Sequence, residues 1–146
     1  GDLPLINPGY LQKLAALLSR SEVDYATLAT PITDGSKVHN PNRVKIAFTQ
    51  LSPELFKAVY FSRIPIPYNA KTYLEHVGIY GFKRKFLRQF VGWTRGTLEQ
   101  QEQLEQLRAI EKGIPCYFAM VPNSPYSVDT IEDLEKVREL AEASVI

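Results

Sequence analysis

Two aspartates in the sequence stand where a divalent cation could be held. Asp2 and Asp129 both fall in loops at the ends of predicted strands, and both precede predicted helices. In open α/β sheets, ligands bind beyond the carboxyl ends of the strands, so the two carboxylates could converge there. Mg²⁺ commonly takes one or two protein carboxylates together with phosphate oxygens, which makes it the expected ion. The alternative is that each aspartate only caps the helix that follows it.

Residues 60–80 hold two further groups suited to polar recognition. Two apolar, β-prone runs bracket a turn that contains Pro65 and Pro67, and proline cannot donate to a strand ladder. Arg63 therefore lies where a strand ends, and its guanidinium can form a bidentate contact with a carboxylate or a phosphate. His76 opens the second run. The structural alternatives are a solvated arginine and a core or rim histidine that the backbone satisfies.

Three glutamates recur at three-residue steps in a predicted helix over residues 97–112. Side chains with this spacing share one face of a helix, so Glu99, Glu102 and Glu105 are expected to form an acidic stripe. Such a stripe is commonly just solvated. Three like charges without interleaved lysines are mildly unfavourable, however, which favours a cationic or hydroxyl-rich neighbour.

These side chains depend on a predicted alternation of helices and strands. The hydrophobic pattern predicts helices over 7–20, 86–91, 97–112 and 130–143, and strands over 25–32, 43–48, 57–62, 73–82 and 115–121. The alternation indicates an α/β fold with a mixed sheet flanked by helices, and with a strand-rich insertion at about 43–82. At 146 residues, the chain is expected to form a single domain, residues 1–146.

The composition argues against several classes of function. The formal net charge is +1, so no basic field points to nucleic acid. No apolar run reaches the length of a membrane-spanning helix, so no membrane insertion is expected. Cys116 is the single cysteine, which rules out an internal disulfide and fits a reducing compartment. No cluster of His and Cys suggests zinc, and no Ser or Cys lies in a recognisable nucleophile motif.

Seven short motifs together resemble the CMP-Kdo synthetases, a family also called 3-deoxy-manno-octulosonate cytidylyltransferases. Each motif is weak alone, but all seven occur in the family's order and with similar spacing across nearly the whole chain. They are GDxP at 1–4, ATL at 26–28, NPNxVK at 40–45, YFSRxxIP at 60–67, HxGIY at 76–80, LExxExLEQLR at 98–108 and VDTxEDL at 128–134. The resemblance implies a Rossmann-type fold like that of nucleotide-diphospho-sugar transferases.

The resemblance also implies a nucleotidyltransferase that moves CMP from CTP to the sugar acid Kdo and releases pyrophosphate. The product serves lipopolysaccharide synthesis in the bacterial cytoplasm. In this family the aspartates that match Asp2 and Asp129 are the catalytic residues that bind Mg²⁺, and the arginine that matches Arg63 contacts the carboxylate of Kdo. The residues that the resemblance assigns to the sugar pocket are His76, Tyr80, Glu105 and Gln106.

Family members are commonly homodimers, and segment 43–82 is the expected sugar-binding or dimerisation region. Aromatic side chains are frequent in this segment, and they would suit an interface or, equally, a core. They are Phe56, Tyr60, Phe61, Tyr68 and Tyr73.

The sequence departs from the family pattern at two positions and in its extent. Leu3 stands where the family usually has glutamate, and Ser127 stands where it usually has glycine, which could alter the geometry of both loops. The family's N-terminal half, which holds the triphosphate and reads cytosine, has no match here. We therefore expect this chain alone to lack turnover. The alternatives are a related nucleotidyltransferase for another sugar acid, such as a sialic acid, and a non-catalytic sugar-binding or dimerisation module.

Overall fold

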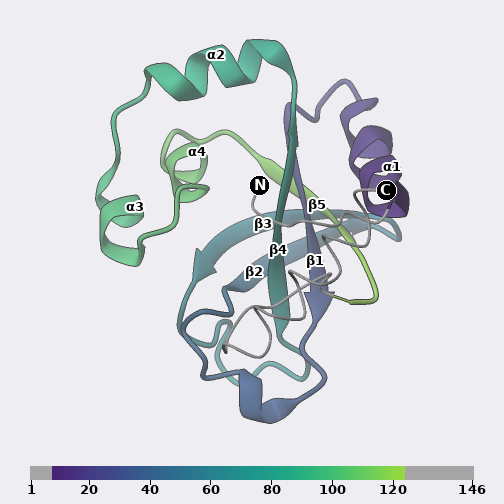
Figure 1. The fold of residues 1–146 in the computed structure, drawn as a ribbon, viewed down its shortest axis with the longest axis vertical. Coiled ribbons are helices and arrows are strands. Elements are labelled where there is room, and N and C mark those ends of the chain that lie inside the picture. Colours follow the sequence, from purple (N-terminus) through teal and green to yellow (C-terminus); the bar gives the residue numbers. More distant parts are fainter. Residues whose placement is uncertain (1–7, 124–146) are drawn as a thin grey trace, which may run out of the picture.

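Five strands form one strongly curved sheet that closes into a barrel in the computed structural model, which describes residues 8–123. The strands are β1 (Tyr25–Pro31), β2 (Lys45–Ser52), β3 (Leu55–Ser62), β4 (Leu74–Phe82) and β5 (Cys116–Met120). Their spatial order is β1-β4-β2-β3-β5, and β5 pairs with β1 in parallel, whereas the other pairs are antiparallel. The predicted mixed sheet is therefore confirmed (Figure 1).

Helices flank the sheet on two sides (Figure 1). α1 (Pro8–Leu18) packs against β1, β4 and β5. On the other side lie three helices that connect β4 to β5 along the chain: α2 (Arg84–Gly92), α3 (Thr97–Glu102) and α4 (Leu107–Glu111). A short 3-10 helix, η1 (Gly35–Lys37), lies between β1 and β2 in the sequence. None of the helices within residues 8–123 has the length and apolar character needed to cross a membrane. The predicted helix 130–143 lies outside the described residues.

β1 is buried on both faces, which explains why its sequence is apolar rather than alternating. Tyr10, Leu14 and Leu17 of α1 cover one side, where they pack with Leu28 and Val77. A second cluster covers the other side and brings residues of β2, β3 and β5 together with α2 and α4, namely Ile46, Phe61, Phe118, Phe86 and Leu107. Each large apolar side chain buried in this way contributes about 1.5–3 kcal/mol to stability.

Charged side chains lie at the contact between β2 and β4 and connect the two strands. Lys45 lies opposite Glu75 in the register, and the amide of His76 donates to the carbonyl of Val44 at 2.8 Å. Arg43 forms an ion pair with Glu75 at 2.7 Å. Lys45 is fully buried, and its Nζ donates to the carbonyl of Asn40. Burial lowers the pKa of Lys45, and the nearby carboxylate of Glu75 opposes that effect.

The aromatic residues of segment 43–82 divide between core and surface. Phe61 is completely buried, and Phe56 and Tyr60 pack against the same cluster. Tyr68, in the turn after β3, is 97% exposed. The core interpretation therefore holds for Phe61, and only the turn presents a fully exposed ring.

The continuous helix predicted over residues 97–112 is wrong. α3 ends at Glu102, Gln103 takes the left-handed conformation with φ of 59°, and α4 starts only at Leu107. Arg63 explains the break, because its guanidinium donates to the carbonyls of Glu102 and Gln103 at the end of α3. The last carbonyls of a helix lack intrahelical partners, so a cationic donor there stabilises the end of the helix.

A buried ion pair joins α3 to α4. Arg108 donates to both carboxylate oxygens of Glu99, at 2.8 and 2.6 Å, and Glu99 is only 3% exposed. The guanidinium of Arg108 also lies over the ring of Phe90, 4.6 Å from its centroid, which connects the pair to α2. The hydrogen bonds from Arg108 hold the pKa of Glu99 below its ordinary value.

We expect Glu99→Ala to lower the free energy of unfolding by about 3 kcal/mol at pH 7, because it leaves the guanidinium of Arg108, which is only 15% exposed, without its carboxylate. The depressed pKa means that this stabilisation is present above the ordinary carboxyl range and is lost as the pH falls through the lowered pKa. Urea denaturation measures both effects. Glu22→Ala is the matched control, since the Glu22 pair with Arg20 is exposed and 3.7 Å long, and removing it should change stability by less than about 0.5 kcal/mol. Equal losses in the two variants would contradict the role given to the buried pair.

Candidate functional site

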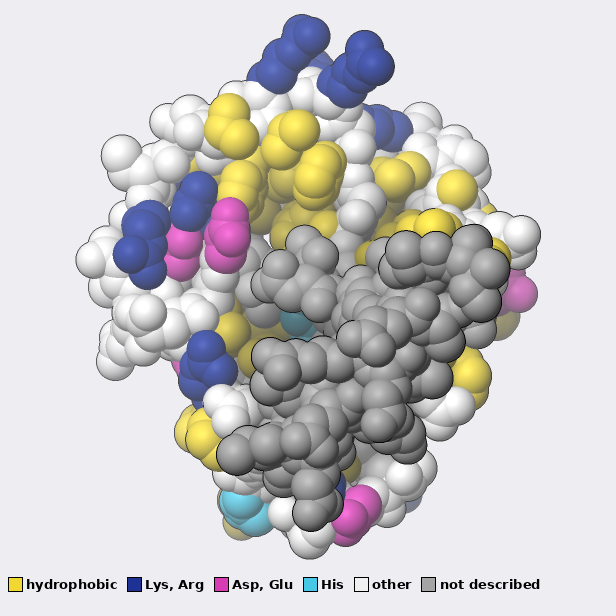
Figure 2. Space-filling model, in the orientation of Figure 1, with side chains coloured by type: hydrophobic (Ala, Val, Ile, Leu, Met, Phe, Trp, Pro, Cys, Tyr) yellow, Lys and Arg dark blue, Asp and Glu magenta, His cyan; other side chains and the backbone are white. Residues whose placement is uncertain are grey.

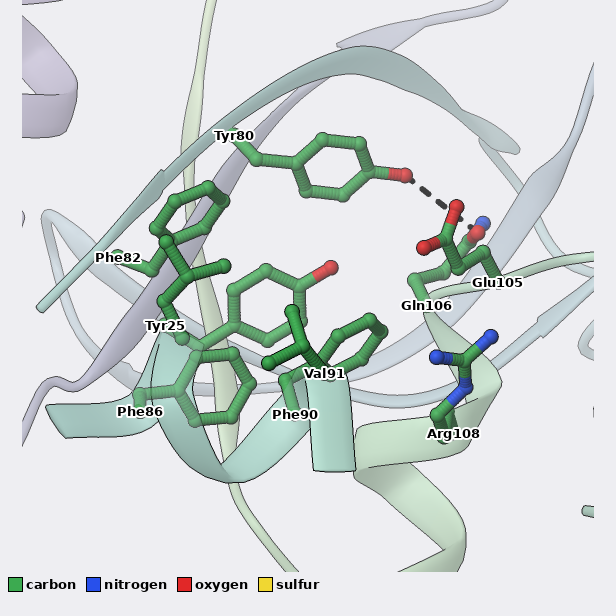
Figure 3. A pocket seen from close by; sticks show the side chains of 10 residues that line it. Tyr25, Tyr80, Phe82, Phe86, Phe90, Val91, Glu105, Gln106 and Arg108 are labelled. Atoms are coloured by element: carbon green, nitrogen blue, oxygen red, sulfur yellow. Dashed lines mark hydrogen bonds between the residues drawn. The ribbon is translucent and has the colours of Figure 1, made fainter. Parts of the chain in front are cut away.

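A pocket of about 390 Å³ opens between α2, the adjoining ends of β1 and β4, and the start of α4. Aromatic and aliphatic side chains line most of it, and polar groups gather at one end (Figure 3). The lining residues are Tyr25, Tyr80, Phe82, Phe86, Leu87, Phe90, Val91, Glu105, Gln106 and Arg108. Figure 2 shows lysine and arginine side chains projecting beyond a band of hydrophobic side chains at the end of the molecule where α2 lies.

Stacked rings form the apolar wall of the pocket. Tyr25, at the start of β1, stacks on Phe86 of α2 with ring centroids 4.7 Å apart, and on Tyr80 of β4 at 5.6 Å. Burial raises the pKa of both Tyr25 and Tyr80 well above the ordinary tyrosine value. Both phenols are therefore neutral at pH 7 and offer hydroxyl groups rather than charge.

At the polar end, a chain of hydrogen-bonding side chains leads from Tyr80 in the pocket to Thr27 in the sheet. Tyr80 donates its hydroxyl to Oε1 of Gln106 at 3.4 Å, and Nε2 of Gln106 lies 3.5 Å from Nδ1 of His76. On its other side, Nε2 of His76 lies 2.8 Å from the hydroxyl of Thr27. The carboxylate of Glu105, an exposed residue, lies beside Gln106 at the pocket's polar end (Figure 3).

His76 is uncharged within this chain of hydrogen bonds. Its ring packs against Phe61, with centroids 5.1 Å apart, and against Tyr80 at 5.3 Å. Burial lowers its pKa to about 3, so the imidazole is neutral at pH 7 and can donate with one ring nitrogen and accept with the other.

Four of the predicted site residues thus come together, and Arg63 lies apart from the pocket lining. His76, Tyr80 and Gln106 share hydrogen bonds, and Glu105 lines the same pocket. Arg63 instead donates from Nε to Glu102, from Nη1 to Pro41 and from Nη2 to Gln103, each time to a backbone carbonyl. These bonds use three of the five N–H groups of the guanidinium.

The acidic stripe predicted from Glu99, Glu102 and Glu105 does not form, because the break at Gln103 turns the three side chains to different partners. Glu99 pairs with Arg108, and Glu102 accepts hydrogen bonds from the hydroxyl of Ser62 and the amide of Arg63. Only Glu105 lines the pocket.

The predicted metal ligands cannot be placed, since Asp2 and Asp129 lie outside the described residues. Among residues 8–123, no group of three or more His, Cys, Asp or Glu side chains could hold a metal ion. Cys116 is fully buried in the core cluster, and burial raises the pKa of its thiol.

Sequence reasoning missed the apolar wall of this site and three of its residues that carry polar groups. Tyr25 and Arg108 line the pocket, and Thr27 bonds to His76. Thr27 and Arg108 belong to the ATL and LExxExLEQLR motifs, so the motifs contained both residues without revealing their roles. Tyr25 carried the weaker signal of an aromatic residue at the head of an apolar strand.

Comparisons with known proteins agree with the motifs. A sequence model of the cytidylyltransferase family matches residues 1–120. The 3-deoxy-manno-octulosonate cytidylyltransferase of Rhizobium meliloti is 41% identical over 145 residues, which are 99% of this chain and 58% of that protein. The protein of the same name from Paramagnetospirillum magneticum is 43% identical over 98% of this chain and 58% of its own length.

The fold agrees as well. The structure of a CMP:2-keto-3-deoxy-manno-octonic acid synthetase complexed with CTP matches 97% of this chain and 59% of its own, with a TM-score of 0.83 and 34% sequence identity. This chain thus spans just under three fifths of the length of the relatives it matches. Because the family model covers most of the sequence and the motifs and the fold point the same way, the chain belongs to the cytidylyltransferase family.

Proposed function

We propose that this chain supplies the acceptor-sugar side of an enzyme that transfers CMP from CTP to Kdo and releases pyrophosphate, in the bacterial cytoplasm and for lipopolysaccharide synthesis. The main support is the polar end of the pocket, where Tyr80, Glu105 and Gln106 meet beside a neutral His76. The names and the 41% and 43% identities of the relatives support the same substrate.

These residues are suited to binding a sugar acid through its hydroxyl groups. The carboxylate of Glu105 accepts hydrogen bonds from hydroxyls, and the amide of Gln106 can both donate and accept. The aromatic wall excludes water around the bound sugar, which strengthens each of these hydrogen bonds. The residues hold the acceptor hydroxyl in place for attack on the α-phosphorus of CTP, where an O–P bond forms and the bond to pyrophosphate breaks.

Arg63 is proposed to bind the carboxylate of the sugar acid with the two N–H groups that its carbonyl bonds leave over. In this role a single guanidinium would hold both the end of α3 and the anionic end of the substrate.

Mg²⁺ is proposed to bind Asp2 and Asp129, as the matching motifs suggest. The ion would neutralise charge on the phosphates of CTP. This assignment rests on the motifs alone, because both aspartates lie outside the described residues.

A chimaera tests the function. Joining this chain to the part of the Rhizobium meliloti relative that it does not match should give a protein that releases pyrophosphate from CTP when Kdo is present. This chain alone should release none. In the same chimaera, Asp129→Asn should weaken Mg²⁺ binding and lower turnover by roughly a hundredfold or more.

The choice of sugar acid decides between the candidate enzymes. Activity of the chimaera with a sialic acid but not with Kdo would overturn the proposed substrate, and inactivity with every sugar acid would favour the non-catalytic module. Wild-type turnover in Asp129→Asn would refute the metal role.

Arg63→Ala should raise the KM for Kdo roughly ten- to hundredfold, because a charged hydrogen-bonding partner of the carboxylate is lost, while the KM for CTP changes little. Ser62→Ala is the matched control, since it removes one anchor of Glu102 and leaves the guanidinium in place. Steady-state kinetics of the chimaera measure both variants. An equal rise in Ser62→Ala would assign the effect to the end of α3, and a loss confined to CTP would contradict the carboxylate role.

The protein is also proposed to be a homodimer that joins through β3 and the turn after it. Three apolar side chains are exposed there: Val59 at 54%, Ile64 at 65% and Tyr68 at 97%. Val59→Glu should therefore shift the sedimentation coefficient from that of a dimer to that of a monomer, because a charge would be buried in the interface. Leu11→Glu, on the exposed side of α1, is the control and should leave the dimer intact. A monomeric wild-type protein would contradict the proposal.

A further inference from the structure

Thr27 occupies an irregular place in the pairing of β1 with β4. Ala26 pairs with Gly81 and Leu28 pairs with Val77. The two pairs are therefore two residues apart in β1 but four residues apart in β4, so β4 bulges between them. Such a bulge leaves polar backbone groups outside the ladder. Thr27 lies opposite it, and its completely buried hydroxyl is 2.8 Å from the carbonyl of Ile79 and 3.2 Å from that of Val77.

The same hydroxyl determines which nitrogen of His76 carries the proton. A threonine hydroxyl has one hydrogen, and here the two bulge carbonyls, which can only accept, take it. The third close neighbour is Nε2 of His76 at 2.8 Å, so this nitrogen must donate to the hydroxyl oxygen. The neutral ring is therefore protonated on Nε2, and Nδ1 keeps its lone pair.

This tautomer sets the direction of the hydrogen bonds that lead to the pocket. The lone pair on Nδ1 faces Nε2 of Gln106, so the amide must present its NH₂ group to His76 and its oxygen to Tyr80. Tyr80 then uses its only hydrogen on Gln106, so its hydroxyl oxygen, which also interacts with the hydroxyl of Tyr25, can act only as an acceptor at the pocket's polar end.

We propose that Thr27 is a positioning residue whose hydroxyl holds the β4 bulge and the Nε2-protonated form of His76, and thereby orients Gln106 and Tyr80 toward a ligand hydroxyl. The bonding order follows from the geometry alone. The identity of the ligand as a sugar acid rests on the function proposed above.

NMR of the ring nitrogens tests the proposal without reference to turnover. The chain contains two histidines, His39 and His76, so a ¹⁵N-histidine sample gives two sets of ring signals, and His39→Gln assigns them. At pH 7 the wild-type His76 should show a protonated Nε2 and an unprotonated Nδ1. Thr27→Val, which has nearly the same shape but no hydroxyl, should lose this preference, and Thr27→Ser should keep it.

A wild-type His76 protonated on Nδ1, or present as a mixture of tautomers, would overturn the proposal even if Thr27→Val failed to fold. A folded Thr27→Val with an unchanged His76 spectrum would overturn it as well. In the chimaera, Thr27→Val should raise the KM for the sugar acid roughly tenfold with the KM for CTP unchanged, and Thr27→Ser should restore it. A correct tautomer together with a chimaera inactive on every sugar acid would reject the proposed function and leave the positioning role standing.

Discussion

The guanidinium of Arg63 is the constraint on which the arrangement of the pocket depends. Its hydrogen bonds to Pro41, Glu102 and Gln103 tie the loop before β2 and the end of α3 to the end of β3. Because the carbonyls at the end of α3 are satisfied from outside, the chain can leave the helix at Gln103 without a loss of hydrogen bonding. The turn that follows places Glu105 at the pocket rather than on the face that carries Glu99.

Two helices this short need support from side chains. α3 has six residues and α4 has five, and isolated helices of that length are not stable in water. The carboxylate of Glu111 accepts from the second and third amides of α3, those of Leu98 and Glu99, at 3.1 and 3.3 Å. Gly96 makes this approach possible, since a Cβ there would collide with the Glu111 carboxylate. The ion pair of Glu99 with Arg108 then fastens the two helices together.

The pocket combines a wall of stacked, neutral rings with a polar end that includes the charged side chains of Glu105 and Arg108. Tyr25, Tyr80 and His76 are all neutral at pH 7 because burial disfavours their charged forms. Hydrogen bonding between these neutral groups therefore depends on which of them donate and which accept. The bulge in β4 links this property to the barrel, because the hydroxyl that satisfies the bulge also bonds to His76.

The family and much of the fold could be predicted from the sequence. The family could be predicted because seven motifs occur in its order and with similar spacing, and apolar runs such as that of β1 predicted the strands. His76, Tyr80, Glu105 and Gln106 were also predicted as neighbours, through the resemblance alone. The sequence by itself thus determined the residue types of the site and the order of most elements.

The tertiary structure decided the features that depend on contacts between distant residues. A local pattern predicted one helix over 97–112, but Arg63, some 40 residues earlier, ends it at Glu102. In the sequence, Thr27 has the features of an ordinary strand residue. Only the pairing of β4 with β1 brings its hydroxyl to the carbonyl of Ile79, which lies 52 residues later. Helical and strand periodicity describe only near neighbours, so neither the left-handed turn at Gln103 nor the protonated nitrogen of His76 could be derived from them.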